Sequence, residues 1–190
     1  MKKRASNLLA LTLFFLPAAV FAHSGHANHG FIDGLIHPFL GMDHLLAMLV
    51  VGIWSVLRAR SIWLAPLSFV AMLTVGAVLG QNGLSAPQLE PLVAASVLVF
   101  GLMIALSIKL KEATSLTIIG GFALFHGMAH GGELSGDYTV LSGIVLGSAL
   151  LHGLGMSFAH AFLKQHPQLA KRLGQLVAVL GGGLVLSVMI

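Results

Sequence analysis

Long uncharged stretches, separated by short polar segments, occupy most of this chain. Six of them lie within residues 38–190, and each approaches the ~20 apolar residues that a helix needs to cross a bilayer. The first contains one acid, Asp43, and the other five contain no Asp, Glu, Lys or Arg. The sequence therefore predicts an all-α integral membrane protein with a six-helix transmembrane bundle. The predicted spans are residues 38–57, 62–80, 91–108, 116–131, 138–163 and 173–190.

Residues 1–22 have the features of a cleaved export signal. Residues 2–4 are Lys-Lys-Arg, a short apolar run with Pro17 follows, and Val20-Phe21-Ala22 places small residues where signal peptidase requires them. The apolar run is too short for a transmembrane helix. We therefore expect cleavage after Ala22, which makes residues 23–37 a histidine-bearing leader outside the cytoplasm.

The basic residues orient the predicted spans. All Lys and Arg beyond residue 22 follow the first, third and fifth spans, and the connections after the second and fourth spans contain none. The positive-inside rule makes the basic connections cytoplasmic. We therefore expect a multi-pass protein of the bacterial inner membrane with both ends of the mature chain in the periplasm.

Composition excludes several classes of protein. The chain is 57% hydrophobic and 8% charged, whereas soluble domains carry roughly 25% charged residues. The formal net charge of +4 includes the three basic residues of the export signal, so a nucleic-acid partner is not supported. The chain has no cysteine, which excludes disulfides, thiolate metal sites and Fe–S clusters. The oligomeric state is left open.

Glycines recur four residues apart in two of the predicted spans. Gly76 and Gly80 form one pair, and Gly143 and Gly147 form the other. Small residues at this spacing share one helix face and let helices in lipid approach closely. We therefore expect close helix packing at these positions.

Ionisable residues in the first span indicate where function resides. Asp43 and His44 lie one to two turns inside it, where an ionisable side chain costs at least ~2.5 kcal/mol and normally faces the bundle interior. Pro38 is expected in the first helical turn, with His37 near the cap position. His37 and His44 would then be about 10 Å apart along a continuous helix. They can share one metal ion only if that turn is irregular or another helix contributes.

The fourth predicted span supplies further ligands. His126 and His130 are four residues apart and share one helix face, an arrangement that can chelate a divalent ion. Because the first span runs inward and the fourth outward, His44 and His126 are expected at the same depth, about 9 Å below the outer face. His37, His130 and Glu133 are expected near that face. We therefore predict one metal site, reached from outside and lined by Asp43, His44, His126 and His130.

Other residues are weaker candidates for a metal path. His152 lies in the fifth span and Glu90 at the outer end of the third. A membrane histidine can equally be a structural hydrogen-bonding residue, and Glu90 can be a solvated acid. In the leader, a free amine on His23 and the imidazoles of His23, His26 and His29 can chelate one divalent ion.

Two motifs in the chain resemble the signatures of the HupE/UreJ family. The first is His37 followed after five residues by Asp43-His44, and the second is FHGMAHGGE over residues 125–133. The resemblance covers the whole chain and implies a secondary permease for nickel or cobalt, often associated with hydrogenase or urease maturation in bacteria. It also implies a metal-handling role for His37, Asp43, His44, His130 and Glu133, with His126 in the same motif.

The expected function is uptake of a divalent transition-metal ion, Ni²⁺ or Co²⁺ by the family resemblance. The expected partners are this ion, as the transported substrate, and the lipid bilayer. Imidazole also suits zinc, and the motifs do not separate nickel from cobalt. We expect no catalysis and no prosthetic group. Two other functions stay open: an intramembrane zinc hydrolase, although the chain has no HExxH motif, and a metal-binding accessory protein without transport.

Overall fold

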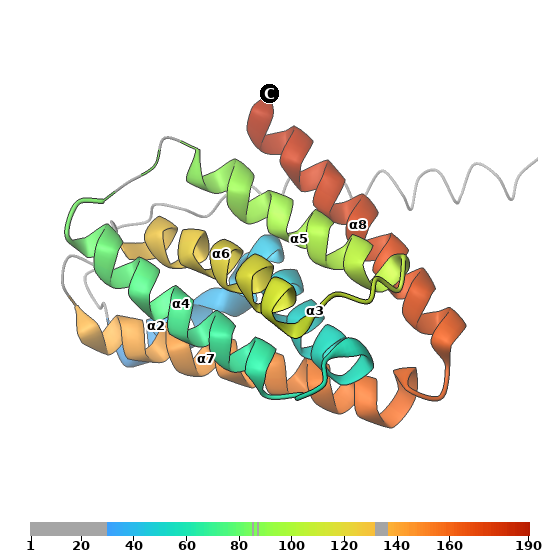
Figure 1. Cartoon of the computed structure of the whole chain (residues 1–190). Coiled ribbons are helices and arrows are strands. Elements are labelled where there is room, and N and C mark those ends of the chain that lie inside the picture. Colours follow the sequence, from blue (N-terminus) through green and yellow to red (C-terminus); the bar gives the residue numbers. More distant parts are fainter. Residues whose placement is uncertain (1–29, 85, 87, 132–136) are drawn as a thin grey trace, which may run out of the picture.

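The computed structural model describes residues 30–84, 86, 88–131 and 137–190. These residues form a bundle of helices joined by short connections, with no strand among them (Figure 1). The predicted export signal, the leader histidines and Glu133 lie outside the described residues. The helices are α2 (Phe31–Leu40), α3 (Met42–Arg58), α4 (Leu64–Gln81), α5 (Leu89–Ala105), α6 (Glu112–Gly131), α7 (Tyr138–Phe158), the π-helical turn η1 (Ala159–Leu163) and α8 (Pro167–Met189).

The predicted number of six spans is supported only in part. Each predicted stretch contains a helix, but three of the described helices are long and apolar enough to cross a membrane: α4, α7 continued by η1, and α8. The α2–α3 pair makes a fourth if it is counted as one broken span. Helix α5 is apolar but shorter, and α6, which contains two histidines and Glu112, does not qualify.

The first predicted span is wrong in its start and in its continuity. Helix α2 begins at Phe31, upstream of the predicted start, and Pro38 lies inside it instead of in the first turn. Gly41 has an extended backbone (φ −89°, ψ 125°), and α2 and α3 are bent by 84° at this break. Proline and glycine are the two residues that least favour a helix interior, which accounts for a break just after Pro38.

Helix α3 is the core of the bundle. It contacts α7, α5, α2 and α4, while α4 packs on α6, α5 packs on α8 and α2 packs on α7. A continuous run of α3, from Val50 to Val56, is buried, whereas α7 and α8 expose large apolar side chains such as Leu150, Leu154 and Val179. This distribution is typical of a bundle whose outer helices face lipid.

Glycine brings the paired helices close together, as its spacing predicted. A Cβ atom on Gly76 would collide with the carbonyl oxygen of Leu124 on α6, and one on Gly143 would collide with the carbonyl oxygen of Phe31 on α2. Both glycines therefore allow backbone-to-backbone contact. The α4–α6 contact matters for the site, because α6 contains His126 and His130.

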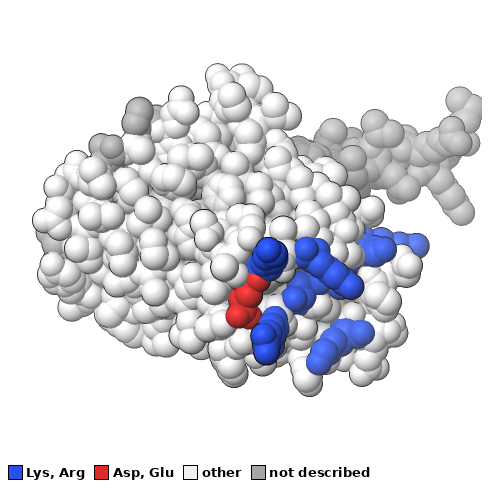
Figure 2. Space-filling model, in the orientation of Figure 1, with Lys and Arg blue, Asp and Glu red and all other residues white. Residues whose placement is uncertain are grey.

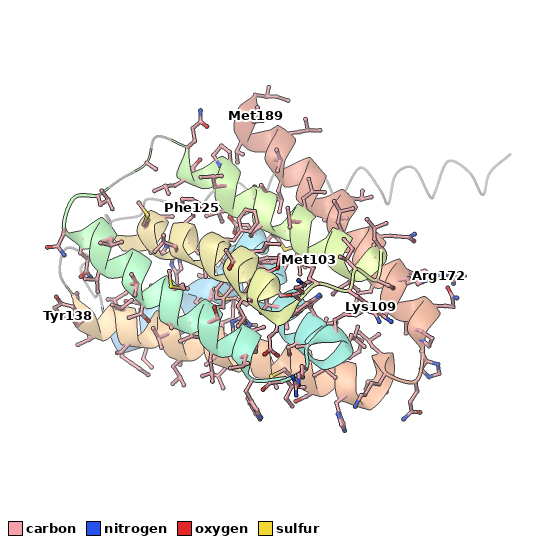
Figure 3. All side chains as sticks on the ribbon, in the orientation of Figure 1. Met103, Lys109, Phe125, Tyr138, Arg172 and Met189 are labelled. Atoms are coloured by element: carbon pink, nitrogen blue, oxygen red, sulfur yellow. The ribbon has the colours of Figure 1, made fainter. Side chains whose placement is uncertain are left out.

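The two ends of the bundle differ in charge. Figure 2 shows the Lys and Arg side chains gathered at one end of the visible face. Lys109 and Arg172 lie at this end and Tyr138 at the opposite end (Figure 3). All basic residues of the described part belong to connections or helix ends on the basic side: Arg58, Arg60, Lys109, Lys111, Lys164, Lys171 and Arg172. A cavity of about 310 Å³, lined in part by Arg58, Lys111 and Glu112, also lies here.

Candidate metal site

The break at Gly41 brings two histidines of the first motif together. His37 lies in the last turn of α2, and His44 lies in the first turn of α3. Their ring centroids are 6.0 Å apart. A continuous helix would have separated the two residues by about 10 Å along its axis. The segment between the two histidines is therefore irregular, although the irregularity lies at Gly41 and not in the first turn of the helix.

Helices α3 and α6 bring the second motif to the same place. Both helices run between the basic end and the opposite end, in reverse directions, so residues near the start of α3 lie beside residues near the end of α6. The ring centroids of His44 and His126 are 4.8 Å apart, and those of His37 and His130 are 4.4 Å apart. These are the pairs that matching depths predicted.

Asp43 holds His44 in one orientation. Oδ1 of Asp43 lies 2.7 Å from Nδ1 of His44 and accepts the backbone N–H of His44 at 2.8 Å. A carboxylate can only accept, so Nδ1 donates its hydrogen and Nε2 is left with a lone pair. Such a carboxylate–histidine pair fixes the tautomer and ring orientation of metal ligands. The carboxylate also lies at the start of α3, where the helix dipole favours negative charge.

Ser96 on α5 gives His126 a fixed tautomer in the same way. The Ser96 hydroxyl donates to the carbonyl of Val93 at 2.6 Å, so its oxygen accepts from Nε2 of His126 at 2.9 Å. The lone pair of His126 is then on Nδ1. This nitrogen is buried and has no hydrogen-bond partner among the described residues. His126 therefore has one nitrogen held by the protein and one available for a ligand.

His130 completes the cluster with a direct contact to His44. The two Nε2 atoms are 2.6 Å apart. Two imidazole nitrogens bound to one divalent ion would be about 3 Å apart, so a small outward shift makes room for an ion between them. Within the described residues, no three His, Asp or Glu side chains are placed to hold one metal ion together. The pair therefore needs a further ligand.

The cluster is buried but open at one side. His126 is fully buried, and the His44 and His130 residues are each 8% exposed. The Asp43 side chain is 32% exposed, against 11% for that of His44. His37 is half-buried. Asp43 lies in the first turn of α3, at the other end of that helix from Arg58.

The remaining predicted residues lie apart from the cluster or outside the described part. Glu90 is exposed in the first turn of α5, and no hydrogen bond or ion pair in the described part joins it to the histidines. His152 is buried on α7 and contacts α3 instead of the cluster's nitrogen atoms. Glu133 and the leader residues His23, His26 and His29 lie outside the described residues.

Sequence reasoning missed two residues that contact the histidines. Ser96 was not selected, although a serine inside an apolar span is a signal that could have found it. Phe69 on α4 packs its ring 5.4 Å from the ring of His126 and 5.0 Å from that of His152, centroid to centroid. Nothing in the sequence distinguishes Phe69 from any other apolar core residue.

Replacing Ser96 with alanine is expected to weaken binding of a metal ion about tenfold, because His126 loses the acceptor that fixes its tautomer. Equilibrium binding of Ni²⁺ by the purified variant measures the effect. Ser148→Ala is the matched control, because Ser148 is equally buried but donates only to Ile144 of its own helix. Equal binding by both variants would contradict the role assigned to Ser96.

Comparison with known proteins identifies the family of this chain. The chain matches the family model described as HupE / UreJ protein over residues 9–184. It is 36% identical to "Protein HupE" of Rhizobium leguminosarum bv. viciae in an alignment 190 positions long, which covers 97% of this chain and 98% of that protein. No solved structure matches the chain. With its helical fold, apolar helices and two histidine motifs, this membrane protein belongs to the HupE/UreJ family.

Proposed function

We propose that this protein is a secondary permease that takes up a divalent transition-metal ion, Ni²⁺ or Co²⁺, across the bacterial inner membrane. The observation that carries the proposal is the cluster of His37, His44, His126 and His130 from three helix segments, with Asp43 beside it. Imidazole with carboxylate suits Ni²⁺ and Co²⁺, and the family resemblance implies the same ions.

The broken α2–α3 segment supports transport over static binding. Broken helices are a recurrent feature of transporter binding sites, because helix ends offer polar groups inside the membrane. Here the break at Gly41 places Asp43 at the start of α3 and His37 at the end of α2. A transported ion must also be released, which favours an incomplete ligand set over a closed cage.

The orientation follows from the charged end of the bundle. The positive-inside rule places the end with Arg58, Lys109 and Lys171 in the cytoplasm. The histidine cluster then lies toward the periplasm, and six spans put both ends of the mature chain there. In this arrangement α5 and α6 complete the six, with α5 spanning about 26 Å of a core that is about 30 Å thick.

Glu133 is our candidate for the missing ligand. It follows His130 by three residues, so its Cα atom is within about 11 Å of that of His130 whatever the backbone conformation. A carboxylate added to the Nε2 atoms of His44 and His130 would give an ion three ligands. Glu133→Gln removes the charge at nearly constant volume, and uptake at limiting metal is expected to fall at least tenfold.

Uptake by the purified protein in liposomes tests the proposal. We expect accumulation of Ni²⁺, Co²⁺ or both, above protein-free vesicles and above the His44→Ala variant. Mg²⁺ serves as a negative control, because imidazole ligands do not suit it. Zn²⁺, which imidazole does suit, serves as the comparison for selectivity among transition-metal ions. Vesicles that contain correctly folded protein but accumulate none of the transition-metal ions would refute the permease assignment.

The leader histidines are proposed to capture metal before it reaches the cluster. Replacing His23, His26 and His29 together with alanine should lower uptake at scarce metal but not at saturating metal, because a tethered chelator raises the local ion concentration. The uptake rate is measured at both concentrations, with the double variant of His160 and His166, exposed near the basic end, as control. A defect that is equal at both concentrations would place the leader in translocation instead.

A further inference from the structure

His152 is a buried histidine that the proposed outer site does not use. It lies in the middle of α7 and is 1% exposed. Its Nδ1 atom is 2.7 Å from the carbonyl oxygen of Met48 on α3. A carbonyl only accepts, so Nδ1 has the hydrogen and Nε2 has the lone pair. Nε2 is buried and has no hydrogen-bond partner among the described residues.

This arrangement is the one that metal-binding histidines adopt. Such residues donate one ring N–H to a carboxylate or backbone carbonyl and present the other nitrogen to the ion. A buried acceptor without a partner is costly, so its presence requires a reason. In a purely structural histidine, the second nitrogen would also be expected to have a partner.

The helix crossing around His152 holds its donor nitrogen in place. A Cβ atom on Gly52 of α3 would collide with the carbonyl oxygen of His152, and one on Gly155 of α7 would collide with that of Leu49. Helices α3 and α7 therefore meet backbone to backbone within one turn of the Nδ1–Met48 contact. The ring orientation, and with it the position of Nε2, is fixed by the crossing of the two helices.

His152 lies deeper in the bundle than the outer cluster. Met48 is one turn further along α3 than His44, about 6 Å toward the basic end. The Phe69 ring packs against both His126 and His152, with centroid distances of 5.4 and 5.0 Å. Both histidines next to this ring have a buried nitrogen without a partner, Nδ1 in His126 and Nε2 in His152.

We propose that His152 is an inner metal-binding residue, reached from the histidine cluster through its member His126, with the Phe69 ring packed against both histidines. His126 would pass a divalent transition-metal ion from the outer cluster to Nε2 of His152 when the ring moves aside. This inference rests on the proposed transport function and assigns Nε2 of His152 as the second ligand position along the path of the ion.

Two substitutions separate a ligand role from a structural one. In His152→Asn the side-chain amide can still donate to the Met48 carbonyl, as Nδ1 does, but no atom replaces Nε2. In His152→Gln the longer side chain reaches the Nε2 position with an oxygen and gives up the Nδ1 donor. His160→Asn, on the exposed side of η1, is the control for a histidine lost near the basic end.

Liposome uptake of Ni²⁺ and Co²⁺ as a function of external concentration tests the inference. For His152→Asn we expect a maximal rate at least tenfold below wild type, a half-saturating concentration within about twofold, and unchanged thermal unfolding in detergent. His152→Gln should keep more of the maximal rate than His152→Asn, because an oxygen ligand remains.

The outcomes distinguish this inference from the proposed function. No uptake by the wild-type protein would overturn the permease function itself. Uptake by wild type and an equal maximal rate for His152→Asn would overturn the metal-binding role of His152 alone. A lowered unfolding temperature in His152→Asn, with an equal loss of rate in His152→Asn and His152→Gln, would also overturn this role. This result would show that His152 is a structural residue.

Discussion

Replacing His44 with alanine is expected to reduce metal uptake to the level of protein-free vesicles while the protein still folds and inserts. His44 contacts every other member of the outer cluster: Asp43 at Nδ1, His130 at Nε2, and the rings of His37 and His126. Its removal leaves Nε2 of His130 without the neighbouring nitrogen with which it is proposed to bind the ion. The measurement is Ni²⁺ or Co²⁺ uptake in liposomes, normalised to the amount of inserted protein.

Asp43→Asn is the milder companion of this change. The amide oxygen can still accept from Nδ1 of His44, so the ring keeps its orientation, but the negative charge next to the ion is lost. We expect uptake to fall at least tenfold, in line with other carboxylates that hold metal-bound histidines. His166→Ala, exposed at the start of α8, is the control. Normal uptake by either cluster variant in correctly inserted form would show that this cluster is not the transport site.

Gly127→Ala is expected to cause the largest loss of stability. A Cβ atom at this position would collide with the backbone carbonyl of Leu73, and a backbone contact cannot move aside as a flexible side chain can. Helices α4 and α6 would have to separate, which costs about 3 kcal/mol or more. Since Gly127 directly follows His126, the outer cluster would be disturbed as well.

Gly121→Ala on the same helix is the matched control. A Cβ atom there meets nothing within 4 Å, so alanine is expected to be neutral or slightly stabilising. Thermal unfolding of the two variants in the same detergent should differ by about 10 °C, given ~2–4 °C per kcal/mol for a chain of this size. Similar unfolding temperatures would contradict the close α4–α6 packing.

Uncharged stretches predicted where helices occur, but α2, α6 and α8 begin four to seven residues before the predicted starts of the first, fourth and sixth spans, because these helices extend through polar residues beyond the apolar stretch. Counting residues from the outer ends of the first and fourth predicted spans put His44 beside His126, and the structure places their rings 4.8 Å apart. The small-residue spacing at Gly76 also predicted a close helix contact, because the absence of a side chain lets the neighbouring helix approach that face.

The break in the first span was missed because Pro38 fits two positions. Proline is common in the first helical turn, and that reading placed the helix start at Pro38. The helix instead begins at Phe31, and Gly41 ends it. The local sequence pattern does not show whether Pro38 lies in the first turn or inside the helix, because the packing of α2 against α7 also contributes. Ser96 was missed because it comes from a helix whose rotation about its axis depends on the whole bundle.

X-ray absorption at the nickel edge of the loaded, detergent-purified protein tests the central claim most directly. The account predicts at least two imidazole ligands per ion in the wild-type protein and their loss in the His44→Ala, His130→Ala double variant. A double variant of His160 and His166, which removes the same number of histidines near the basic end, should leave the spectrum unchanged. Identical spectra for the wild type and the His44, His130 double variant would contradict a metal site at this cluster.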